Sequence, residues 1–194
     1  MFLLREPSIS ALKSFLHAQQ GQSFSYQEIG ASREQTHAGY DVDHNRVLLG
    51  SGEEAFGKAI AALRAWKMFD LGWCRIYPSN APIEVGTTVA ILINHFGFWS
   101  LNASRIVYVI DEDGLLRRYG FAYGTLAEHG EIGEERFSVE WKQEDGSVWY
   151  DLYAFSTPGH ILAKFGYPLS RRLQKRFIEG SKMAMGRAVK NGSL

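Results

Sequence analysis

The chain has 194 residues, of which 45% are hydrophobic, 13% aromatic and 22% charged, and its 21 basic and 21 acidic side chains leave no net charge. This composition is typical of one folded domain with a short extension, and it excludes an intrinsically disordered chain. No apolar run approaches the roughly 20 residues of a membrane span, the apolar start is too short for a signal peptide, and a single cysteine excludes a disulfide framework. We therefore expect a reduced, cytoplasmic protein.

Two helices and one strand are predicted first in the chain. Residues 7–19 carry apolar side chains at helical spacing, and residues 46–50 are a short apolar strand. The clearest helix is predicted at residues 52–71, because its apolar residues also recur at helical spacing and because Ser51 stands before it with Glu54 three residues later. That spacing is the capping box, in which a hydroxyl and a carboxylate satisfy free backbone N–H groups at the helix start.

Six strand signals and a final helix follow. The strands are predicted at residues 73–77, 86–94, 98–110, 115–126, 134–143 and 147–156, with turns rich in Asp and Gly between several of them. Hairpin connections of this length make neighbouring strands antiparallel. Pro158 ends the last strand, which is apolar on both faces, so each face of the sheet needs a cover. A long amphipathic helix is predicted after Pro168.

This order predicts an α+β protein in which a curved antiparallel sheet is closed on its concave side by the long C-terminal helix. Such a closure leaves either a filled core or a cavity between helix and sheet, and the sequence does not distinguish the two. We assign residues 46–194 to this domain and residues 1–45 to an N-terminal extension. The short helix of the extension is expected to pack on the main domain, over part of the convex face.

Two resemblances add to this prediction. The order of elements resembles the helix-grip fold of the START and pollen-allergen (SRPBCC) superfamily of lipid-binding proteins and polyketide cyclases. That resemblance implies about six to seven strands wrapped on the helix, with a ligand cavity beneath it. The local motifs resemble the DUF1990 family, which has no established activity and so implies no catalytic residue. These motifs are Leu49-Gly-Ser-Gly52, Ala62-Leu-Arg-Ala-Trp66-Lys-Met-Phe69, Leu101-Asn-Ala-Ser-Arg105-Ile-Val-Tyr108-Val-Ile-Asp111, Gly120-Phe-Ala-Tyr-Gly-Thr-Leu126, Gly133-Glu-Glu-Arg-Phe137 and Ser147-Val-Trp-Tyr-Asp151.

Charge is distributed unevenly along the chain. Residues 160–190 hold eight basic side chains and one acidic one, a net charge of +7, so the remainder carries −7. Either a basic helix lies on an acidic body, or the helix meets an anionic partner. Without a recognition motif, such a helix predicts only weak and sequence-blind binding, and we do not expect a nucleic-acid partner.

The richest polar stretch spans residues 129–136. A histidine and carboxylates in such a stretch could move protons or hold a metal. His129 and Glu131 lack the second half of a metal site, and we predict neither a metal nor another cofactor. Glu134 and Arg136 share one face of the predicted strand. They form either a solvent-facing ladder of ion pairs or the mouth of a cavity, where Arg136 anchors a ligand carboxylate or phosphate.

Other candidate residues come from the strands. Asn102 and Arg105 head a strongly apolar strand, where they either contact a ligand or satisfy backbone and acidic groups. Tyrosines on consecutive strands either line a semi-polar pocket or pack in the core. Cys74 is interpreted as an inert buried thiol. The ligand-binding candidates are Asn102, Arg105, Tyr108, Tyr123, His129, Glu134, Arg136, Tyr150 and Tyr153.

Three hypotheses follow for the function. The leading one is that the protein binds a hydrophobic or amphipathic small molecule between the sheet and the C-terminal helix. We favour binding because the sequence shows no set of acid, base and nucleophile residues. The second is a cyclase- or hydrolase-like enzyme on the same fold, with His129, Glu131 or Glu134 as proton carriers. The third is a structural or interaction protein, or a weak binder of anionic surfaces through the basic helix. The sequence gives no oligomeric state.

Overall fold

The computed structural model describes residues 1–33, 39–95, 97–127, 129–158 and 167–192. Its elements in chain order, with η marking short 3-10 turns, are β1 (Phe2–Leu3), α1 (Ile9–Gln19), η1 (Ala31–Arg33), β2 (Asp41–Ser51), α2 (Gly52–Arg64), η2 (Lys67–Phe69), β3 (Cys74–Tyr77), β4 (Thr88–His95), β5 (Phe98–Glu112), β6 (Leu116–Thr125), β7 (Glu131–Lys142), β8 (Ser147–Pro158) and α4 (Tyr167–Asn191).

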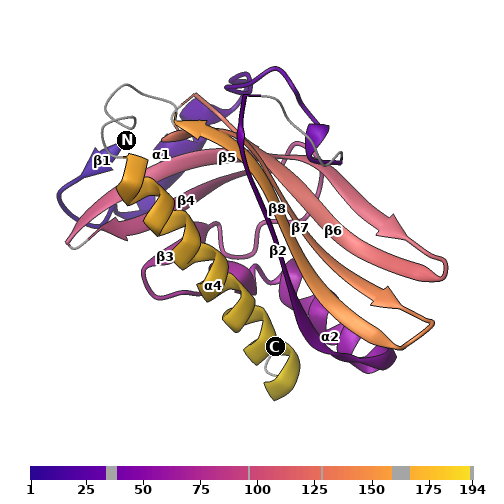
Figure 1. Ribbon diagram of the computed structural model, residues 1–194. Helices are drawn as coiled ribbons and strands as arrows, with labels where there is room; N and C mark the ends of the chain where they lie inside the picture. The colour runs from indigo at the N-terminus through magenta and orange to yellow at the C-terminus, as the bar shows by residue number, and fades with distance from the viewer. Residues whose placement is uncertain (34–38, 96, 128, 159–166, 193–194) are drawn as a thin grey trace.

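One antiparallel sheet organises the molecule. Its strands follow the order β2-β8-β7-β6-β5-β4-β3, and β1 pairs separately with β5. The sheet is strongly curved, and α4 crosses its hollow side (Figure 1). Ile178, Met185 and Val189 of α4 pack into the main core cluster with side chains from the sheet. The α+β class, the antiparallel curved sheet and the closing C-terminal helix are therefore confirmed.

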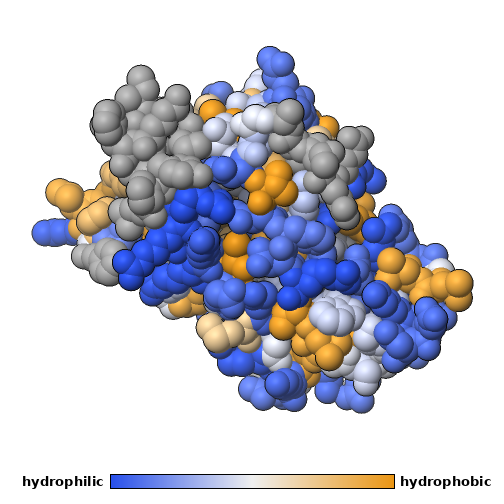
Figure 2. Space-filling view, viewed as in Figure 1, coloured by the Kyte–Doolittle hydropathy of each residue, from blue (hydrophilic) through white to orange (hydrophobic). Residues whose placement is uncertain are grey.

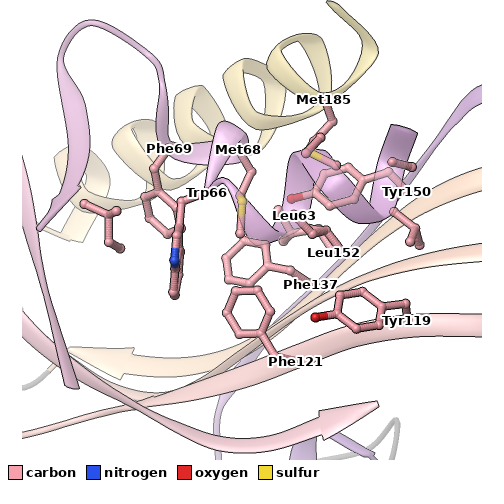
Figure 3. Packing of buried hydrophobic residues seen from close by; sticks show 14 of the residues in the cluster. Leu63, Trp66, Met68, Phe69, Tyr119, Phe121, Phe137, Tyr150, Leu152 and Met185 are labelled. Carbon is pink, nitrogen blue, oxygen red and sulfur yellow. The ribbon is translucent and has the colours of Figure 1, made fainter. Parts of the chain in front are cut away.

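The concave side is filled by aromatic side chains at the end of the sheet nearest α2. Trp66, Met68 and Phe69 are almost completely buried there, and Phe121 and Phe137 of the sheet pack beneath them (Figure 3). The helix predicted at residues 52–71 ends earlier, because Trp66 adopts a left-handed backbone with φ 53° and η2 follows. A continuous helix would point Trp66 and Met68 to opposite sides, whereas the turn brings both into the core.

The start of α2 also differs from the prediction. Ser51 does precede the helix, but its side chain makes no capping hydrogen bond. Its backbone continues β2, where Ser51 pairs with Ser147. Gly52, at φ 79°, then turns the chain sharply from strand to helix, a conformation that favours glycine.

The N-terminal residues lie on the convex side. Leu12 and Phe15 of α1 pack with Leu92 and Leu101 of the sheet, and Arg105 on that side binds the end of α1.

β2 begins at Asp41, so the boundary that we placed after residue 45 falls inside a strand. The division into extension and domain itself stays a prediction. No helix in the described part of the chain is long and apolar enough to cross a membrane.

Candidate functional site

Strand β7 sends neighbouring glutamates to opposite faces of the sheet. Glu131 and Glu135 face the concave side, where Glu135 lies opposite Tyr123 and Ala154 in the register. Glu134 faces the convex side, where it contacts the N-terminal residues. The strand begins at Glu131, three residues earlier than predicted, because β8 pairs with the polar stretch from Glu131 onward and satisfies its backbone groups.

Polar side chains gather on the concave face at the end of the sheet that meets the first turns of α4. We call this group the polar end. Register and hydrogen bonds place its members on neighbouring strands, in contrast to the apolar packing around Phe121 and Phe137. The polar end consists of Asn102, Ser104, Tyr123, Thr125, Glu131, Glu135 and Ser156.

Glu135 is the central carboxyl of the polar end. The Tyr123 hydroxyl donates a hydrogen bond to Glu135 Oε2 at 2.6 Å. Burial raises the pKa of Glu135 to about 8, and the charges of Glu131 and Asp43 add to the rise. The side chain nevertheless keeps intermediate exposure, although it points to the inside of the fold. Glu135 is therefore a largely protonated acid at neutral pH that keeps partial exposure to solvent.

Glu131 links the polar end to α4. Its Oε2 accepts hydrogen bonds from Ser156 Oγ at 3.0 Å and from Gln174 Nε2 at 2.5 Å. Burial raises the pKa of Glu131, although these hydrogen bonds oppose the rise. Arg171, one turn before Gln174, donates to both carboxylate oxygens of Asp43, at 2.6 and 2.8 Å. The first turns of α4 are thus tied to the polar end by side-chain contacts.

Ser104 and Asn102 extend the polar end across β5. Ser104 lies opposite Val89 of the core and has 0% exposure, yet its Oγ has no hydrogen-bond partner among the described residues. Asn102 donates to Ser100 Oγ at 3.2 Å and accepts from the Gly130 N–H at 3.2 Å.

Burial lowers the pKa of His129 to about 4, so its imidazole is neutral at physiological pH. His129 is a poor proton donor there.

The convex face collects several of the other predicted site residues around Glu134. We call residues 24–33, which cover it, the strap. The Glu134 carboxylate accepts from Tyr26 Oη at 2.6 Å, Gly30 N at 2.8 Å and Ser32 N at 3.0 Å, and also from the Ser32 hydroxyl. At 2% exposure, Glu134 is neither part of a solvent-facing ladder nor at the mouth of the concave side. It holds the strap on the sheet.

Arg136, Tyr108 and Tyr153 lie on this convex side too. Arg136 donates to the Ser32 carbonyl at 2.7 Å and to Asp151 at 3.0 Å, and its guanidinium lies 5.1 Å from the centre of the Tyr153 ring. Tyr108 and Ser32 share a hydrogen bond of 2.6 Å. A β-bulge between Ile106 and Tyr108 turns Tyr108 away from the concave face. The tyrosines named from the sequence therefore do not line one pocket.

Three further residues named in the sequence analysis make contacts that stabilise the fold. Arg105 donates to the carbonyls of Gln19 and Gln22, at 2.8 and 2.7 Å, and so holds the end of α1. Tyr150 is buried in the core and shares a 2.8 Å hydrogen bond with Ser181 of α4. Cys74 is buried as predicted, and burial raises the pKa of its thiol, which disfavours the reactive thiolate. Whether any candidate binds a ligand stays a prediction.

Sequence reasoning missed Glu135, Ser104 and Thr125. Glu135 carried a usable signal, because strand alternation places it on the same face as Phe137 and Val139, and a carboxyl on an apolar face is unusual. Ser104 and Thr125 carried none, since small hydroxyl residues occur on every kind of strand. Among the described residues, no three His, Cys, Asp or Glu side chains stand close enough to hold a metal.

Some basic residues of α4 face the body of the protein, and others face solvent. Arg171 faces inward to Asp43, which fits a basic helix lying on an acidic body. Arg172, Lys175, Arg187 and Lys190 are exposed. Figure 2 shows the resulting hydrophilic surface along α4. Lys164, part of the same charge run, lies outside the described residues.

A surface hollow of about 500 Å³ lies apart from the polar end. It is lined by one face of α2 and by the connection after β3, namely Gly57, Ile60, Ala61, Arg64, Ala65, Ser79 and Asn80. The hollow is wide open, and the Arg64 guanidinium in it is already bound to the Tyr119 hydroxyl at 3.0 Å. We therefore place the candidate site at the polar end.

Comparison with known proteins identifies the family. The model of the domain of unknown function DUF1990 matches residues 25–184. The chain belongs to the DUF1990 family. A UPF0548 protein of Dictyostelium discoideum is 38% identical over 208 residues, covering 97% of this chain and 96% of the relative. The matched range takes in the polar end and all of the strap except its first residue. This family is the one that the motifs resembled.

Solved structures support the fold of this DUF1990 protein. Thermus thermophilus TTHA0849 matches with a TM-score of 0.53 at 11% identity, over 79% of this chain and 100% of that one. Human STARD10 matches with a TM-score of 0.45 at 11% identity, over 94% of this chain and 81% of that one. The match to TTHA0849 supports the fold described above, and at 11% identity the likeness concerns the fold alone.

Proposed function

We propose that this DUF1990 protein binds a hydrophobic or amphipathic small molecule between the polar end and the first turns of α4. The observation that carries the proposal is Glu135, which faces the inside of the fold, has one hydrogen-bonding side chain on it, and keeps intermediate exposure. A carboxyl with only a structural role is expected to be saturated by donors, as Glu134 is. Glu135 instead keeps acceptor capacity for a ligand.

Apolar surface for the rest of the ligand lies beside these polar groups. Ile106 and Phe137 flank Tyr123 and Glu135 on the sheet, and Phe177 of α4 lies above, with its ring 6.4 Å from that of Phe137. Small-molecule sites are usually apolar with a few convergent polar groups that fix orientation. This arrangement fits an amphipathic molecule with a single polar headgroup.

A reducing, cytoplasmic location remains part of the proposal, because the single cysteine needs no oxidising compartment.

An acid–base enzyme is the second candidate, and one observation favours it. A reachable carboxyl with a pKa of about 8 can give and take a proton at physiological pH. Of the proton carriers named from the sequence, Glu134 lies on the other face and His129 has a lowered pKa. Glu131 and Glu135 would therefore carry such a reaction.

Titration with the neutral dye N-phenyl-1-naphthylamine tests the binding proposal. We expect a saturable rise in fluorescence that Ala154→Phe removes, because Ala154 lies opposite Glu135 and a phenyl ring would fill the space. Ala65→Phe, at an exposed position after α2, is the matched control. Both variants are first checked for cooperative thermal unfolding. A rise that Ala154→Phe leaves unchanged, in a folded variant, contradicts the proposed site.

Native mass spectrometry of freshly purified protein complements the dye. A co-purifying small molecule that is absent from the Ala154→Phe variant would support the site and give the ligand's mass. A co-purifying molecule that persists in the variant at full occupancy would place the ligand elsewhere and contradict the proposal.

A further inference from the structure

We infer that the ligand of the polar end carries a positively charged amine, and that the Glu135 carboxyl binds it. The inference rests on the proposed function and narrows it from amphipathic molecules in general to amphipathic amines. It is carried by the charges that face Glu135 and by a hydroxyl that lacks a partner.

The charged and titratable groups around Glu135 are acidic or neutral. Tyr123 of β6, Cys74 of β3 and Tyr150 of β8 are neutral at physiological pH, and burial raises the pKa of each still further. Glu131 and Asp43 add negative charge that acts on Glu135. Among the described residues at this end, the cation Arg171 donates two hydrogen bonds to Asp43, and its charge also acts on Glu131. Glu135 itself accepts no hydrogen bond from a cationic side chain of the described residues.

Ser104 is an independent sign of a missing polar partner. Its hydroxyl is fully buried, faces the concave side and has no hydrogen-bond partner among the described residues. Buried polar groups are nearly always paired in native proteins. Ser104 stands opposite Thr125, the next inward-facing residue after Tyr123 on β6, so it lies on the same part of the concave face as the Tyr123–Glu135 pair. An ammonium group has three N–H donors, so it can bind the carboxylate and still donate to further oxygens of this face.

Ligands of other charge fit less well. A carboxylate or phosphate would add negative charge beside Glu131 and Glu135, with Arg171 already engaged. A neutral alcohol could bond to Glu135 but would gain nothing from the negative charge of Glu131 and Asp43 nearby. An ammonium group is attracted by the negative charge of Glu131 and Asp43, and its arrival ionises Glu135 and releases the proton that burial holds there.

Three probes with the same chain and different headgroups test the inference: n-octylamine, n-octanol and n-octanoate, measured by isothermal titration calorimetry. We expect octylamine to bind at least about ten-fold more tightly than octanol, and octanoate to bind weakest. In two buffers of different ionisation enthalpy, octylamine should release about 0.9 protons at pH 7 and about 0.1 at pH 9, since Glu135 is ionised at the higher pH before the ligand arrives. Octanol should release none.

Two variants assign the effect to Glu135. Glu135→Gln should bring octylamine and octanol to similar affinity and abolish proton release, while Tyr123 keeps an acceptor and the fold is retained. Glu144→Gln, on the exposed β7–β8 turn, is the matched control and should behave as the unmodified protein. Equal affinities in the unmodified protein, or an amine preference that survives Glu135→Gln, would overturn the amine inference and leave the binding proposal standing. Failure of the three octyl probes and the naphthylamine dye to bind would overturn both.

Discussion

Glu134 and Glu135 are consecutive residues of one strand, yet the structure uses them in opposite ways. Glu134 is 2% exposed and accepts from four donors of the strap. Glu135 has Tyr123 as its hydrogen-bond donor, keeps intermediate exposure and has a pKa raised to about 8 by burial. The cause is strand geometry, because consecutive side chains point to opposite faces of a sheet.

The comparison shows how a carboxyl that stabilises a fold differs from one that remains available. A saturated carboxylate in a ring of donors holds two chain segments together, and removing it leaves several buried donors unpaired. An undersaturated carboxyl contributes little to stability and keeps capacity for another molecule. The predictions below follow from this contrast.

The largest effect is expected from Glu134→Gln. The amide has one acceptor oxygen, and its NH₂ group would face donors of the strap, so we expect a loss of about 2–4 kcal/mol in the free energy of unfolding. Urea denaturation measures it. The same substitution at Glu135 is the control, since it should raise stability at pH 7, where the raised pKa of this buried carboxyl disfavours the folded state. Equal losses in the two variants would remove the distinction between them.

Gly124→Ala is expected to displace the strap from the sheet. A Cβ atom at this position would lie 2.1 Å from the Tyr26 hydroxyl, which is the group that donates to Glu134. We expect the free energy of unfolding to fall by about 2 kcal/mol, because the strap must shift. Gly57→Ala has open space in helix α2 and should stabilise the protein by up to about 1 kcal/mol. Unchanged stability in Gly124→Ala would show that the strap is not held as described.

Glu135 should make stability fall as the pH rises. Its folded pKa of about 8 lies above the value in an unfolded chain, so between these two values the folded state holds more protons than the unfolded state. The stability that this protonation supplies is present below the unfolded pKa and is lost by pH 8. We expect Glu135→Gln and the unmodified protein to have similar urea midpoints at pH 5, with the variant gaining steadily until about pH 8. A difference independent of pH would be incompatible with a raised pKa.

The smallest effect is expected from Tyr123→Phe. Loss of the hydroxyl should cost about 1 kcal/mol in the free energy of unfolding. It should also raise the pKa of Glu135 further, because the Tyr123 hydrogen bond favours the ionised carboxylate. The midpoint of the pH dependence described above would then move to higher pH. A midpoint that stays in place would mean that this hydrogen bond does not act on the ionised form.

Much of the fold was predictable because hydrophobic periodicity and turn chemistry are local. The strand signals from 98–110 onward overlap β5 to β8, and the amphipathic C-terminal segment is α4. The shortened α2 and the early start of β7 were not predictable, since a buried turn at Trp66 and pairing of a polar stretch depend on distant residues. The candidate site was predicted only in part, with Asn102, Tyr123 and Glu131 at the polar end.

The sequence by itself determined the class of fold, the closing helix and the family, because these follow from the order of apolar repeats and from local motifs. Only the tertiary structure decided which candidates share a face. The β-bulge that turns Tyr108 outward and the strap that encloses Glu134 both arise from contacts between segments far apart in the chain. Such contacts set burial and hydrogen bonding, and these physical quantities separate Glu135 from its neighbour.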